Sequence, residues 1–171
     1  MNVLELKKSL KEGRPSGWES IPDMELYMDQ ILSLMKQQQL GLDEDGKLTA
    51  SMVNNYIKKG ILPRAKGKKY KRSHVAYLTA ICVFKQILSV SETDALLKDQ
   101  LEDQEIEDFY KKFILEVDSA FTKVSESLHG DMDRDELSDT ILKLAVSSYA
   151  QKLACQQLLK FAAELDEGNP L

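Results

Sequence analysis

Apolar residues recur at steps of three and four along most of the chain, which is the spacing of helices that bury one face. The clearest example covers residues 105–128, where the apolar side chains fall within about 140° of a helical wheel. A final long helix is expected over residues 135–165, with most of its charges on a narrow stripe. Most of its circumference should therefore be covered by protein, and the fold should be mainly α.

The first part of the chain predicts shorter helices. An amphipathic start over residues 3–10 is broken by the Gly and Pro residues of 13–17. Pro22 and Asp23 signal the start of a second helix. That helix is expected to fade before the turn-rich residues 41–46.

Polar residues mark three later helix starts. Thr49 is expected to cap a helix that runs through Lys59 and is closed by Gly60. Ser73 can cap the following helix, and Ser91 the next one, in a pattern that resembles a capping box. Between the first and second of these helices, residues 61–70 contain a Pro, a Gly and several bases, which favours two small strands around a turn.

The charge is segregated along the sequence. Residues 46–91 contain ten bases and no acid, whereas the whole chain has a net charge of −5 and the remainder therefore carries −15. A nucleic-acid site needs a local basic face, so the acidic total does not exclude one.

Composition argues against several other classes of protein. No apolar run approaches the roughly 18–20 residues of a membrane span, and the first 11 residues lack a signal-peptide pattern, so a cytoplasmic protein without membrane contact is expected. Cys82 and Cys155 suit a reduced core, and His74 suits a position beside a helix cap. No motif for a metal, a cofactor or catalysis is present, so we expect neither a metal nor an enzyme.

The helix expected after Thr49 has two unlike faces. Val53, Tyr56 and Ile57 form an apolar face that should dock on the protein. The other face carries amide, hydroxyl and ammonium groups, which suit base edges in the major groove of double-stranded DNA. The residues expected at base edges are Ser51, Asn54, Asn55 and Lys58.

The neighbouring basic segment is expected to hold phosphates. Each neutralised phosphate would add salt-dependent affinity. The residues in this group are Lys59, Arg64, Lys66, Lys68, Lys69, Lys71 and Arg72, with Tyr70 packing against sugar or backbone. A solvated surface without a partner is the competing interpretation of these charges.

The segments 49–63 and 68–78, with the helix that follows them, resemble a MerR-type winged helix-turn-helix. They are similar in particular to a YkrK-type family of Gram-positive bacterial proteins that are treated as candidate transcriptional regulators. The resemblance implies a mainly α fold with a small β-hairpin wing formed around residues 69–72. It covers residues 18–91 best, and Asn54 stands where MerR proteins have an Arg.

The resemblance and the charge pattern together predict three parts: an N-terminal arm (1–17), a winged helix-turn-helix (18–90) and an acidic helical region (91–171). The function expected is sequence-specific DNA binding by a transcriptional regulator, as a homodimer joined by its C-terminal helices. A simple coiled coil is not expected, because Ser148 and Gln151 interrupt the seam of apolar residues. The alternatives are a protein-interaction module with a vestigial helix-turn-helix, or a C-terminal pocket for a small-molecule effector that the sequence does not identify.

Overall fold

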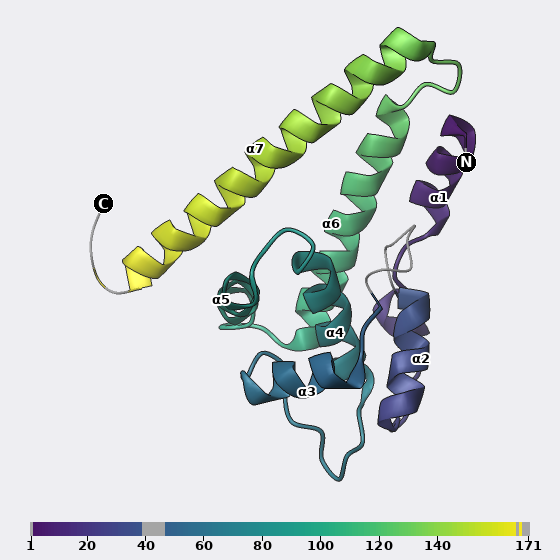
Figure 1. Cartoon of the computed structure of the whole chain (residues 1–171). Coiled ribbons are helices and arrows are strands. Elements are labelled where there is room, and N and C mark those ends of the chain that lie inside the picture. The colour runs from purple at the N-terminus through teal and green to yellow at the C-terminus, as the bar shows by residue number, and fades with distance from the viewer. Residues whose placement is uncertain (1, 39–46, 167, 169–171) are drawn as a thin grey trace.

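The computed structural model describes residues 2–38, 47–166 and 168, so the turn expected at 41–46 lies outside the described residues. The described chain is mainly α-helical, as the periodicity predicts, and contains no sheet (Figure 1). The elements are α1 (Val3–Glu12), the 3-10 helix η1 (Trp18–Ser20), α2 (Met28–Gln38), α3 (Ala50–Lys58), α4 (Arg72–Phe84), α5 (Val90–Gln100), α6 (Ile106–Ser127) and α7 (Arg134–Asp166).

Helix α6 is the element around which the others are arranged. Its apolar stripe buries Phe109, Tyr110, Phe113 and Val117, as the sequence pattern predicts. Helix α4 packs on its N-terminal half, where the rings of Phe84 and Phe113 meet edge to face with centroids 5.6 Å apart. Helix α1 lies along its C-terminal half (Figure 1).

One core cluster joins these elements. It includes Ile31 and Met35 of α2, Val53 of α3, Leu78 of α4 and Phe113 of α6, so the core continues across residue 90. Burial of this many large apolar side chains is the main source of stability in such a fold.

Helix α2 begins at Met28, several residues later than Pro22 and Asp23 suggested. The reason is a long-range backbone pairing. The N–H of Leu26 donates to the carbonyl of Tyr70 and the N–H of Tyr70 donates to the carbonyl of Leu26, both at 2.8 Å. This bridge holds the chain before α2 in an extended form.

Two other helix starts also differ from the expected ones. Helix α4 is capped at Lys71, not Ser73, because Nδ1 of His74 accepts the Lys71 N–H at 3.0 Å. Helix α5 begins after Ser89, not Ser91, because Ser89 and Glu92 exchange the two hydrogen bonds of a capping box. The side chain of His74 therefore has the helix-cap role that the sequence favoured.

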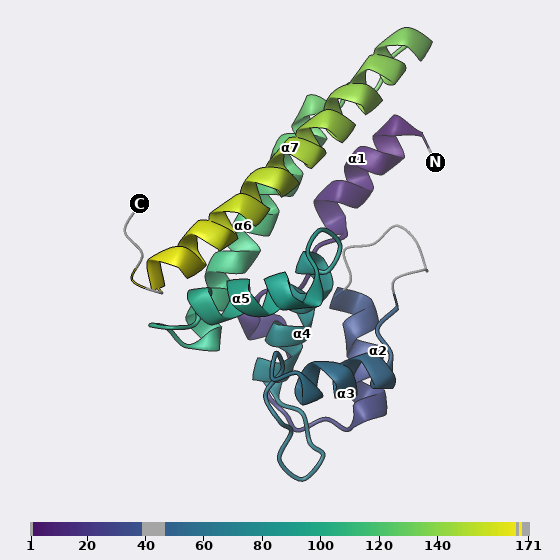
Figure 2. The same cartoon turned by 60° about the vertical axis from the view of Figure 1, so that its left-hand side comes forward.

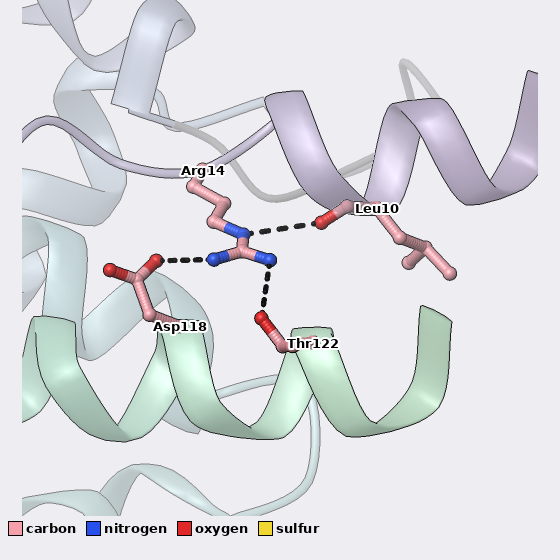
Figure 3. A network of polar contacts seen from close by, with 4 residues as sticks. All are labelled: Leu10, Arg14, Asp118 and Thr122. Carbon is pink, nitrogen blue, oxygen red and sulfur yellow. Dashed lines mark hydrogen bonds and ion pairs between the residues drawn. The ribbon is translucent and has the colours of Figure 1, made fainter. Parts of the chain in front are cut away.

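The N-terminal helix is fixed to α6 by a half-buried arginine (Figure 3). Arg14 donates to Asp118 at 2.8 Å, to Thr122 at 3.0 Å and to the carbonyl of Leu10 at 3.3 Å. These bonds join the end of α1 to two successive turns of α6. A fourth contact, from Lys7 Nζ to the carbonyl of Leu128 at 2.6 Å, extends the attachment to the end of α6.

Helix α7 runs back past α6, and the C-terminal part of α7 reaches α5 (Figure 2). The expectation that protein covers most of α7 is wrong for the single chain. Nine of its large apolar side chains are 39–68% exposed, including Leu142, Tyr149, Leu153 and Phe161.

Candidate nucleic-acid interface

Helix α3 presents the polar face that the sequence predicted. Thr49 caps it, with Oγ1 accepting the N–H of Met52 at 3.2 Å. Val53 and Tyr56 are buried in the core. The four residues expected at base edges all point away from the core and are exposed: Ser51, Asn54, Asn55 and Lys58.

The end of α3 directs the chain into the basic segment. Lys59 is the C-cap, and Gly60 has φ +79°, the left-handed conformation that closes many helices. The N–H groups of Ile61 and Leu62 both donate to the carbonyl of Tyr56. Ile61 and Leu62 are buried, so this turn is held in place by the core.

The basic segment forms a tight turn without the two strands that were expected. Gly67 and Lys68 have φ of +61° and +60°, which is typical of a two-residue hairpin turn, and the N–H of Lys69 donates to the carbonyl of Lys66 at 3.1 Å. Among the described residues the pairing consists of isolated bridges only. The next residue, Tyr70, pairs with Leu26 on the other side of the chain, so the segment forms two separate bridges and no strand.

This turn, residues 64–71, projects beside α3 at one end of the molecule in both views (Figures 1 and 2). Six bases of the two elements are exposed and make no ion pair with any other described residue. They are Lys58, Lys59, Arg64, Lys66, Lys68 and Lys71. We call this set the free bases.

Two further bases that were expected to hold phosphates are engaged within the protein. Lys69 pairs with Glu25 at 2.8 Å, and hydrogen bonding to Lys69 lowers the pKa of Glu25. Arg72 lies over the ring of Trp18 at 5.5 Å, lies 3.7 Å from Glu19, and its side chain is only 18% exposed. Arg72 therefore helps to fix the start of α4 against η1.

Tyr70 does not face solvent, so its expected contact with sugar or backbone is wrong. The residue is 4% exposed, and its ring meets that of His74 edge to face at 5.4 Å. Burial raises the pKa of its hydroxyl. Its role is to attach the turn to the core, because its backbone also forms the bridge to Leu26.

The residue that the sequence interpretation missed is Tyr27. It is 55% exposed and lies beside Asn54, Arg64 and Lys68, around a groove between α2, α3 and the turn. The sequence pattern predicts Tyr27 on the apolar face of a helix that starts at Pro22 and Asp23. Tyr27 directly follows Leu26, whose bridge to Tyr70 keeps it outside α2, and local periodicity does not reveal that bridge.

Other kinds of site receive no support from the described residues. No group of three or more His, Cys, Asp or Glu side chains is placed to hold a metal ion in that part of the chain. Within the same residues, every helix falls short of the length or apolar content needed to cross a membrane.

The fold and this basic end define a mainly α-helical protein with a projecting cationic turn beside a short polar helix. Comparison with protein families shows a match over residues 16–113, more than half of the chain, to the domain of unknown function DUF1836. The chain belongs to that family. No curated protein and no solved structure matches the chain.

Proposed function

We propose that this protein is a sequence-specific DNA-binding transcriptional regulator with a MerR-like winged helix-turn-helix. One observation carries the proposal: the free bases of α3 and of the 64–71 turn lie at one end of the molecule and form no ion pair with any described residue. A helix of this kind fits the major groove, and a projecting turn beside it meets the phosphate backbone.

The roles follow from exposure. Ser51, Asn54, Asn55 and Lys58 face base edges, where an Asn amide pairs with adenine and a Lys with guanine. The phosphate contacts come from the other free bases: Lys59, Arg64, Lys66, Lys68 and Lys71. Tyr70, Lys69 and Arg72 hold the turn in position through the protein contacts described above.

The first experiment measures binding to a 30-base-pair mixed-sequence duplex as a function of salt. The test variant neutralises four bases (R64Q/K66Q/K68Q/K71Q). Its slope of log affinity against log salt should shrink by up to about 3.6, because each phosphate contact contributes about 0.9. The matched variant changes four exposed lysines elsewhere (K8Q/K11Q/K36Q/K123Q) and should keep the slope of the natural chain.

The two variants have the same net charge, so a difference between them reports position and not total charge. If both variants lost the same amount of salt-dependent affinity, the free bases would contribute no more to duplex binding than any other surface charges. A chain that does not bind duplex, but binds an acidic protein through the same residues, would support the interaction-module alternative. Genome-wide recovery of bound DNA then identifies the operator.

The proposed regulator acts as a dimer, and the exposed apolar side chains of α7 support this dimerisation. An apolar stripe along a helix is normally buried against protein, yet α7 leaves Leu142, Val146, Tyr149 and Leu153 exposed at the spacing of one helical seam. At about 1.5 Å per residue, its 33 residues span about 50 Å, ample length for a two-fold interface. A second copy of α7 offers the same seam, and a two-fold dimer matches a symmetric operator.

A further inference from the structure

A groove lies between the start of α2, helix α3 and the 64–71 turn. Its volume is about 860 Å³, within the range of pockets that hold small molecules. Its walls include the apolar side chains of Met28, Leu32 and Ile57. None of the elements that form it belongs to the C-terminal helices, where an effector pocket was considered from sequence.

The rim of this groove is cationic. Arg64 and Lys68 both line it, both are exposed, and neither makes an ion pair with another described residue. Asp29 is the acid among the lining residues, so the charged groups sum to a positive rim. A guanidinium pairs with a carboxylate through two parallel hydrogen bonds.

An apolar wall beside two cations favours one class of ligand. A neutral apolar molecule leaves the cations unused, and an inorganic anion leaves the apolar wall in water. A molecule with an alkyl or aryl body and one carboxylate satisfies both parts. Asn54, at the edge of the same groove, offers an amide to the same head group.

We propose that this groove binds an apolar carboxylate, and that the bound molecule competes with DNA. Competition follows because Asn54, Arg64 and Lys68 line the groove and also belong to the proposed DNA interface. Only the competition rests on the proposed function; the binding of the carboxylate does not.

The binding test uses the full ¹⁵N-labelled chain, with sodium octanoate as the probe and 1-octanol as its neutral counterpart. Octanoate should shift amide signals of residues 27–32, 50–57 and 64–70, and should bind about tenfold more tightly than octanol. The variant R64Q/K68Q should lose that preference. The variant K11Q/K36Q, which removes two charges outside the groove, should keep it.

Two results would overturn the ligand site: shifts that are spread along the exposed apolar side of α7, or equal affinity for octanoate and octanol. The competition arm measures displacement of the 30-base-pair duplex. Octanoate should displace it and octanol should not. If octanoate binds without displacing the duplex, the proposed competition is wrong. If octanoate binds to a chain that has no affinity for the duplex, the proposed DNA-binding function is wrong but the ligand site is retained.

Discussion

His74 connects the basic turn to the helix that follows it. Its Nδ1 accepts the N–H of Lys71, so the ring is neutral and carries its proton on Nε2. That Nε2 is buried, and the ring packs on Tyr70. Protonation of Nδ1 would place two donors face to face and open the cap.

The pH dependence of stability tests this contact. Burial lowers the pKa of His74 below its usual value, and the charge of Lys71 adds to the effect. The unfolded chain therefore binds the proton more readily than the folded one. We expect the free energy of unfolding to fall as pH drops from about 6.5 towards the lowered pKa.

Urea unfolding at pH 7.5 and 5.5 measures this loss. In His74→Gln the amide oxygen can still accept from Lys71, so this variant should lose less stability on acidification than the natural chain. His129→Gln changes the exposed histidine and serves as the control. An equal loss in the natural chain and in His74→Gln would remove His74 as the cause.

The attachment of helix α1 to the rest of the protein depends strongly on the side chain of Arg14. Arg14 bonds to Asp118, to Thr122 and to the carbonyl of Leu10, and α1 itself contains no buried residue. Helices of ten residues are marginal in water unless tertiary contacts hold them. We expect Arg14→Ala to lower the free energy of unfolding by about 1–2 kcal/mol.

Hydrogen exchange distinguishes this local effect from a general one. In Arg14→Ala the amides of α1 should exchange faster, while those of α4 keep their protection. Lys11→Ala, at an exposed position on the same helix, should leave both unchanged. If α1 stayed protected in Arg14→Ala, the contacts of Lys7 with α6 would be sufficient.

The elements also show what the sequence could predict. Helices α3, α6 and α7 could be predicted, because hydrophobic periodicity and helix caps are local properties of the sequence. Thr49 and Gly60 mark the two ends of α3 correctly. The start of α2 does not follow from local sequence, because it depends on the pairing of Leu26 with Tyr70, which are distant in sequence.

The candidate site was predictable to a similar extent. A helical wheel predicts that Asn54 and Asn55 are exposed, and the structure confirms it. The burial of Tyr70 and the contact of Arg72 with Trp18 depend on tertiary packing, which a count of basic residues does not contain. The exposed seam of α7 lies on another face of the helix than the seam that Ser148 and Gln151 interrupt, so the argument against a simple coiled coil does not apply to it.

For the whole molecule, the main expectation is self-association through α7. The variant L142E/L153E places charges on its exposed seam and should raise the dimer dissociation constant by more than about 100-fold, since burial of each Leu contributes about 1.5–3 kcal/mol. Sedimentation equilibrium measures this constant. The control S147E/Q151E adds the same charge on another face of α7 and should remain dimeric.

Circular dichroism must show equal helix content in both variants. A natural chain that sediments as a monomer at all concentrations would contradict the dimer directly. Dimerisation that is unaffected by L142E/L153E would move the interface to another surface.

The bridge between Leu26 and Tyr70 also has a consequence for how the molecule folds. It closes a loop of chain that contains α2, α3 and the basic turn. The entropy lost on closing a loop grows only with the logarithm of its length, so doubling the length costs about 0.6 kcal/mol. Within this family, chains of different length between α2 and α3 can therefore keep the same closure, and the turn should become fixed only after that loop has closed.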